Sequence, residues 1–226
     1  MEIVALNIYT RHLAKQVEFY TQTLALELVR RSASRATFKV GRSLLTLVEN
    51  DEFQPYHFAI NIPCNQEQEA LAWLKARVTI LKDGSSEIQD FNFWNAKAIY
   101  FYDADKNIVE FIARKNLDNA SGAHFDANAL LEISEIGMPV DDIATTFHAL
   151  KKWTTIERFD GSFERFCAIG DERGLFICIN KNRKDWYPTG DKAHSSEFEI
   201  KLSEKGLAYQ LAFKAGKLVP FVKKEN

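Results

Sequence analysis

The stretch that decides the fold opens with YHFAINIP at residues 56–63 and closes with NIVEFIAR at residues 107–114. Apolar residues recur at every second position after His57, which predicts a strand with one buried face. The segment QEQEALAWLKARV at residues 66–78 has the apolar spacing of a helix. Further strands are expected near 78–81 and 97–102 and in the closing run, which carries Glu110 between apolar residues. The unit is therefore one strand, one helix and three strands.

This unit resembles the module of the vicinal oxygen chelate superfamily, which includes glyoxalase I, bleomycin-resistance proteins and extradiol ring-cleaving dioxygenases. The residues that carry the resemblance are HFAINIP, the helix ending in Trp73 and Leu74, and YFYDADKNIVEFIAR at residues 100–114. The family pattern for the last run is YF-x-DPDGN-x-x-E. Ala104 replaces the usual proline and Lys106 the usual glycine, and these changes alter the turn and not the strand after it.

Weaker copies of the unit cover most of the remaining chain. A first copy spans residues 3–49, a third begins with ISEIGMPV at 133–140, and a shortened fourth begins with SEFEIKL at 196–202. The resemblance implies that such modules pair into half-open barrels. We therefore predict an α+β fold of repeated βαβββ modules paired into half-open β-barrels, with the last module shortened.

The domain organisation follows from the order of these copies. Residues 1–116 are expected to form the first pair of modules and residues 129–226 the second pair, whose fourth module is incomplete. Residues 117–128 are rich in Asn, Asp, Ser, Gly and Ala, and we interpret them as the linker. His124 within it is expected to be an exposed loop residue.

Composition narrows the function classes. The chain has 226 residues, 46% hydrophobic content and a net charge of −2, which gives no reason to expect nucleic acid or an anionic membrane as partner. It has no apolar run near the roughly 20 residues that span a bilayer, and its start lacks the features of a signal peptide. A cytoplasmic location is therefore expected. The tail at 219–226 suggests a weak basic patch or a frayed terminus. Its three cysteines are expected to be reduced and structural.

One face of every module should look into a cleft. Because the apolar residues of each first strand must be buried beneath a helix, the alternate positions point to the opposite, concave face. The aligned concave positions are Ala5, His57, Glu135 and Glu197 in the first strands, and Thr46, Glu110, Cys178 and Pro220 in the last strands.

The resemblance implies a divalent metal (Fe, Mn, Zn or Ni) in such a cleft. His57 and Glu110 match the family's ligand positions, whereas Ala5 and Thr46 of the expected partner module are not usual ligands. A third ligand would come from an unplaced residue, from water or from another subunit. A structural pair between His57 and Glu110 is the alternative, since a buried carboxylate requires a partner.

Three glutamates are candidates for acid–base catalysis. Glu110 belongs to the first cleft, and Glu135 and Glu197 are expected to share the second, where Cys178 is a soft third donor. Two neighbouring carboxylates raise the pKa of one of them, which suits a general acid or base. The alternative is that Glu135 and Glu197 face solvent at strand ends.

Aromatic residues are the candidates for substrate binding. Tyr100, Tyr102 and Trp94 could line the wall of the first cleft. Trp186, in the segment NRKDWYP, could close the second cleft as a lid, and the alternative is a loop that is anchored by burying this side chain.

Two functions are compatible with these residues, so the sequence leaves open whether the chain is an enzyme. The first is a metal-dependent lyase or dioxygenase acting on a small aromatic or vicinal-oxygen substrate. The second is a metal-free small-molecule-binding protein of the bleomycin-resistance type, favoured by Ala5 and Thr46. The exposed strand edges of the shortened module also suggest a homodimer.

Overall fold

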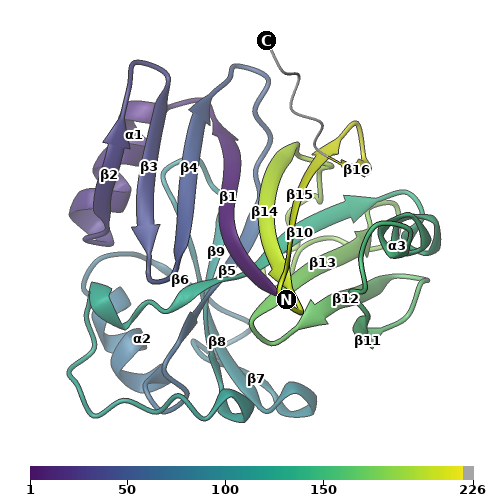
Figure 1. Cartoon of the computed structure of the whole chain (residues 1–226). Coiled ribbons are helices and arrows are strands. Elements are labelled where there is room, and N and C mark those ends of the chain that lie inside the picture. Colours follow the sequence, from purple (N-terminus) through teal and green to yellow (C-terminus); the bar gives the residue numbers. More distant parts are fainter. Residues whose placement is uncertain (221–226) are drawn as a thin grey trace.

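The structure of the protein, a computed structural model, describes residues 1–220, and residues 221–226 of the expected basic tail at 219–226 lie outside the described residues. Two large sheets dominate the structure, and short helices flank their outer strands (Figure 1). This arrangement confirms the predicted α+β fold of repeated modules.

The first module consists of β1 (Glu2–Thr10), α1 (Leu13–Glu18), β2 (Glu27–Arg31), β3 (Arg35–Val40) and β4 (Ser43–Glu49). The second consists of β5 (His57–Ile62), α2 (Glu67–Lys75), β6 (Ile80–Leu81), β7 (Gln89–Phe91), β8 (Ala96–Tyr102) and β9 (Ile108–Arg114).

The third module consists of β10 (Glu132–Val140), α3 (Ile143–Lys151), β11 (Arg158–Gly161), β12 (Phe166–Asp171) and β13 (Gly174–Asn180). The fourth consists of β14 (Phe198–Glu204), β15 (Leu207–Lys214) and β16 (Lys217–Pro220), and within the described part of the chain it has no helix. The expectation of a shortened fourth copy therefore holds.

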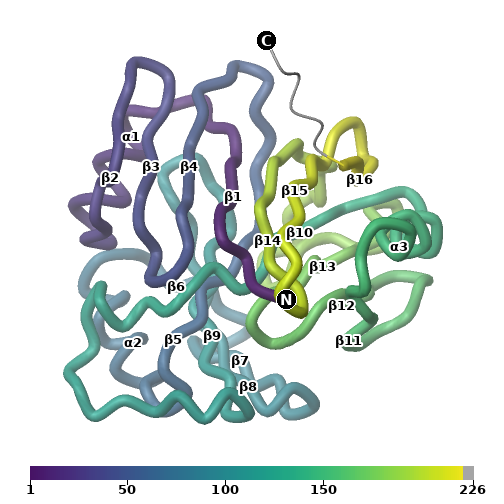
Figure 2. The backbone as a smooth tube through the Cα atoms, in the orientation of Figure 1, coloured from purple at the N-terminus to yellow at the C-terminus, as the bar shows by residue number. Residues whose placement is uncertain are grey.

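The pairing of modules differs from the expected one. β1 runs antiparallel to β14, so the first module shares a seven-stranded sheet with the fourth. β5 runs antiparallel to β10, so the second module shares a nine-stranded sheet with the third. In Figure 2 the backbone leaves the first sheet after β4, passes through the second, and returns in yellow beside the purple β1. The expectation that consecutive modules pair is wrong for this structure, whereas the linker at 117–128 stays a prediction.

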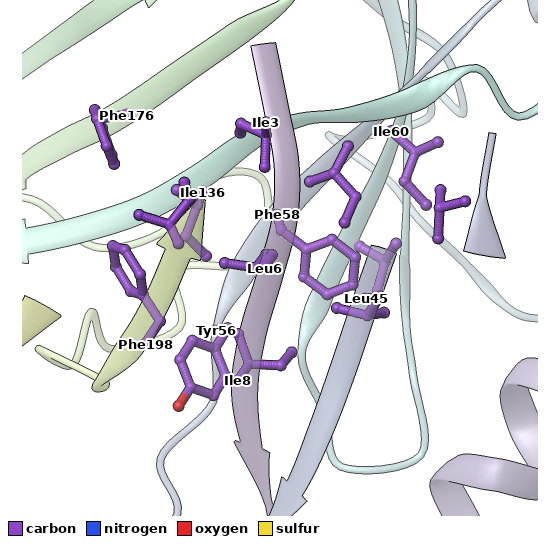
Figure 3. Packing of buried hydrophobic residues seen from close by; sticks show 14 of the residues in the cluster. Ile3, Leu6, Ile8, Leu45, Tyr56, Phe58, Ile60, Ile136, Phe176 and Phe198 are labelled. Carbon is purple, nitrogen blue, oxygen red and sulfur yellow. The ribbon is translucent and has the colours of Figure 1, made fainter. Parts of the chain in front are cut away.

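The core lies where the apolar faces of the two sheets meet. Leu6, Phe58, Ile136 and Phe198, one from each first strand, are fully buried in one continuous cluster (Figure 3). β1 packs against β10, while α2 lies over β8 and β9. Burying each such side chain contributes about 1.5–3 kcal/mol. The alternate residues of the same strands are thereby directed away from the core.

Candidate functional site

His57, the first residue of β5, faces away from the core with a defined orientation. Its Nδ1 lies 3.2 Å from the carbonyl oxygen of Ile108, and because a carbonyl can only accept, Nδ1 is the protonated nitrogen. Nε2 then carries the lone pair in the neutral ring. It lies 3.5 Å from Glu110 Oε2 and 3.8 Å from Glu135 Oε2. The imidazole therefore directs the lone pair of Nε2, which could bind a metal, towards two carboxylates.

Glu110 reaches the same point from β9, where it is paired with Ala59 of β5. Its side chain is buried. Burial raises the pKa of Glu110 well above its usual value, and the charge of Glu135 raises this pKa further, while Arg114 and the Tyr100 hydroxyl oppose the shift. Glu110 thus keeps its proton to a higher pH than a solvent-exposed glutamate does.

Glu135 comes from β10, the first strand of the third module, and it also pairs with Ala59. Its Oε1 accepts a hydrogen bond from Arg114 Nη2, and its Oε2 is the oxygen that faces His57. Ligand atoms of His57, Glu110 and Glu135 all lie within 4.8 Å of one another, and all three residues are buried. Among the described residues this is the one group of three or more His, Cys, Asp or Glu side chains that could hold a metal ion.

The three residues lie in a pocket of about 430 Å³ with largely aromatic walls. Ile177 and Ile179 of β13 contribute apolar side chains to its lining. The aromatic residues that line it are Phe91, Phe93, Trp94, Tyr100, Phe166, Trp186 and Tyr187. Burial raises the pKa of Tyr100 well above its usual value, so its hydroxyl stays protonated. The pocket therefore combines a polar floor with walls suited to a planar apolar molecule.

Residues 181–197, which connect β13 to β14, cross one side of this pocket; we call them the strap. Trp186 of the strap is buried, and its ring centroid lies 5.0 Å from that of His57. Tyr187 donates its hydroxyl to Asp83 Oδ2 or Gln89 Oε1, at 3.0 and 2.8 Å, on the second module. Gly137 leaves the space that the indole occupies, since a Cβ there would lie 2.7 Å from Trp186 atoms.

The structure brings together six of the predicted site residues and separates two. His57, Glu110, Glu135, Trp94, Tyr100 and Trp186 all line this one pocket. Tyr102 is outside the lining and donates its hydroxyl to Asp191 Oδ2 at 2.5 Å. Glu197 is exposed beside the other sheet and accepts a hydrogen bond from the backbone of Ala215 at 3.1 Å.

Two further expectations are corrected. Glu135 and Glu197 do not share a cleft, because their modules belong to different sheets. Cys178 is buried in the core cluster, and its neighbours Ile177 and Ile179 face the pocket instead, so the alignment was one residue out of phase on β13. An apolar side chain thus occupies the position on β13 that corresponds to Glu110 on β9.

The other cleft has a different character. A hollow of about 210 Å³ on the first sheet is lined by Ala5, Thr46 and neighbours that include Asn7, Arg30 and Glu199. Asn7 donates to Glu199 at 3.2 Å. Ala5 and Thr46, which are not usual metal ligands, therefore belong to this hollow, and they do not take the place of a ligand in the pocket at His57.

The donor set at His57 fits a divalent transition metal. Two ligands bound at about 2.1 Å lie about 3.0 Å apart in an octahedral arrangement and about 3.4 Å apart in a tetrahedral one. The 3.5 and 3.8 Å between Nε2 and the carboxylate oxygens are slightly longer, so a small inward movement of the side chains would complete either arrangement. One imidazole and two carboxylates suit Fe, Mn, Zn or Ni. The hydrogen bond from Nδ1 to a backbone carbonyl is the support that metal-bound histidines usually have.

Arg114 is the residue of this site that the sequence analysis missed. It ends β9 and is fully buried beneath the floor, where it binds Glu135. The available signal was its spacing: it stands four residues after Glu110 in an otherwise apolar strand, and residues four apart in a strand share a face.

Comparisons with known proteins agree with the fold. No protein-family model matches the sequence, and no curated protein matches it. A crystal structure of a candidate dioxygenase from Bacillus subtilis superposes with a TM-score of 0.59 at 15% identity, covering 79% of this chain and 63% of that one. A glyoxalase I variant from Zea mays gives a TM-score of 0.53 at 16% identity, covering 78% and 66%. The chain thus spans less than two thirds of either structure.

In the described part of the chain, no helix has the length and apolarity needed to cross a membrane. The paired modules, the concave site and these structural neighbours lead to one conclusion: the chain has the fold that the candidate dioxygenase and glyoxalase I share.

Proposed function

We propose that this protein is a metal-dependent enzyme of the glyoxalase or dioxygenase type that acts on a small planar substrate with two adjacent oxygens. The observation that supports the proposal is the convergence of His57, Glu110 and Glu135 within 4.8 Å at the floor of an aromatic pocket. These three residues would hold one divalent ion. When bound, the ion supplies Lewis-acid stabilisation of charge that develops on substrate oxygen.

The residues of the chain would perform the remaining steps. The aromatic walls, with Trp94 and Trp186, bind the flat apolar part of the substrate and fix its orientation. The Glu110 carboxylate would accept a proton from the substrate and return it. The Tyr100 hydroxyl stays protonated and donates a hydrogen bond to an oxygen in the pocket. The strap excludes water from one side.

Metal titration tests this proposal. Protein prepared without a histidine tag should bind about one equivalent of Mn²⁺, Zn²⁺, Ni²⁺ or Fe²⁺. His57→Ala should abolish this binding, because it removes the nitrogen donor. His124→Ala is the matched control, since His124 is exposed in the loop before β10. Uptake below about 0.2 equivalents by the unmodified protein, for all four ions, would contradict the proposal.

A second candidate is a metal-free binding protein for planar aromatic molecules. A specific observation favours it: Arg114 already neutralises Glu135, and the raised pKa of Glu110 allows it to stay uncharged without a metal. Ala5 and Thr46 do not favour the metal-free candidate, because these residues line the other hollow and not the pocket at His57.

Thermal unfolding with a panel of aromatic compounds separates the two candidates. For a metal-free binding protein, the compounds should raise the melting temperature equally with and without EDTA, and Trp186→Ala should reduce the effect. Stabilisation that disappears with EDTA would favour the enzyme instead. A homodimer and a cytoplasmic location stay predictions from the sequence.

A further inference from the structure

Arg114 is a buried cation fixed beneath the floor of the pocket. Its side chain has no exposed surface. Nη2 donates to Glu135 Oε1, and Nε donates to Asn61 Oδ1 at 3.2 Å. The guanidinium carbon lies 5.5 Å from the centroid of the Trp94 ring. Two hydrogen bonds and one contact with an aromatic ring therefore fix the position of the Arg114 guanidinium group.

Asn61 is itself held in place. Its Nδ2 donates to Glu132 Oε1 at 2.9 Å and to the carbonyl oxygen of Glu172 at 3.0 Å. Because both of its donor hydrogens are used, the amide keeps Oδ1 turned towards Arg114. The guanidinium is thus anchored from the side opposite the pocket.

This anchoring determines how Glu135 presents itself to the site. Oε1 is occupied by Arg114, and only Oε2 faces His57 Nε2, at 3.8 Å. A carboxylate without such a partner can bind a metal through both oxygens. We propose that Arg114 is a positioning residue that confines Glu135 to one ligating oxygen and so keeps neighbouring coordination positions open for a substrate that binds through two adjacent oxygens.

The inference rests on the proposed metal-dependent function and adds a role for Arg114, a residue outside the pocket lining. One nitrogen and two single carboxylate oxygens would occupy about three of the six positions that Mn²⁺ prefers, leaving about three for water or substrate. If Glu135 bound through both oxygens, about two positions would remain, and a chelating substrate would fill both.

The test counts exchangeable water on bound Mn²⁺, measured as the relaxation rate of water protons. With all sites loaded, Arg114→Met should lower this relaxivity by about one third relative to the unmodified protein, because Glu135 takes up one more position. Arg77→Met is the matched control: Arg77 also stacks on a tryptophan, with its guanidinium carbon 4.1 Å from the Trp73 ring, but it donates to the carbonyl oxygen of Trp73 and not to a residue of the pocket. It should leave the relaxivity unchanged.

Equal relaxivity of the Arg114→Met and unmodified proteins would overturn the inference, even if the variant melts at a lower temperature, since a merely structural residue changes stability alone. If Arg114→Met does not fold, Asn61→Ala serves in its place: it releases Nε while keeping the cation, and its relaxivity should fall in the same direction. An unchanged value would again refute the inference. Failure of the unmodified protein to bind Mn²⁺ would refute the proposed function, and this result is distinct from Mn²⁺ binding with unchanged relaxivity.

Discussion

Gly137 and Trp186 offer a sharp test of how the pocket is built. Gly137 lies within β10, and a methyl group added there would lie 2.7 Å from two atoms of the Trp186 ring and 3.1 Å from the carbonyl oxygen of His57. Carbon atoms do not approach to 2.7 Å, so the indole would have to move. Hydrogen bonds between the backbones of Trp186, Gly190 and Asp191, at 2.7 and 2.8 Å, hold it in the strap.

The expected cost of Gly137→Ala follows from two opposing terms. Overpacking of this kind costs about 1–3 kcal/mol. Alanine in place of glycine within a strand recovers about 0.5–1 kcal/mol. The net loss of unfolding free energy should therefore be about 0–2.5 kcal/mol. Trp186→Ala alone removes a buried indole and should cost about 3–5 kcal/mol.

The double variant isolates the contact. With the indole gone, Gly137→Ala should be neutral or stabilise by up to about 1 kcal/mol, which gives a coupling energy of about 1–3 kcal/mol between the two positions. Urea unfolding followed by far-ultraviolet circular dichroism measures all four proteins without relying on tryptophan fluorescence. If Gly137→Ala costs the same in both backgrounds, to within about 0.5 kcal/mol, the proposed packing of Trp186 on Gly137 is refuted.

Three buried carboxylates give further predictions. Because burial raises the pKa of Glu110 in the folded protein, the unfolded chain releases this proton first as the pH rises above about 4.3, and folding becomes less favourable. In metal-free protein, Glu110→Gln should therefore stabilise by a margin that grows with pH; urea midpoints at several pH values check this, and a constant margin would contradict it. For Asp105, burial opposes ionisation, but hydrogen bonds from Thr10 and His12 outweigh it and lower the pKa. Its stabilising contribution should be present above about pH 3.9 and be lost as the pH falls through the lower folded-state pKa, so the cost of Asp105→Asn, measured by thermal unfolding, should vanish in acid. Asp103 accepts hydrogen bonds from Gln16, Tyr20 and Asn107 at 2.7–2.9 Å, and Asp103→Ala should cost about 3 kcal/mol or more in denaturant titrations, because it leaves buried donors without an acceptor; a cost below about 1 kcal/mol would show that water replaces the carboxylate.

The sequence predicts what depends on local pattern. Alternation after His57 indicates which residues of β5 face the core cluster, and the same rule places Glu110 on the opposite face, where the structure has it. The rule fails on β13, where the alignment of Cys178 with Glu110 is one residue out of phase. An alignment error of one residue exchanges the two faces of a strand. The alignment of short apolar runs between modules is therefore the least reliable step of the sequence analysis.

The choice of partner module could not be predicted in this way. Every first strand offers similar apolar residues to a neighbour, and the hydrogen bonds between β5 and β10 involve backbone groups that all residues share. The sequence pattern therefore favours the pairing of consecutive modules, which places Glu135 in a different cleft from His57 and Glu110, whereas the structure brings the three residues together. The poor ligands Ala5 and Thr46 were the available sign that His57 has a different partner.

The return of the chain to its first sheet has a consequence for synthesis on the ribosome. β1 receives β14 along one edge, and the hydrogen-bonded side chains of Asn7 and Glu199 are 192 residues apart. During translation that edge stays unpaired until residues 198–204 have emerged, although β4 pairs with the other edge early. Such an unpaired edge invites association with another nascent chain. A premature stop codon after β13 would make that exposure permanent, so the shortened last module protects the newly made protein from aggregation as well as completing its sheet.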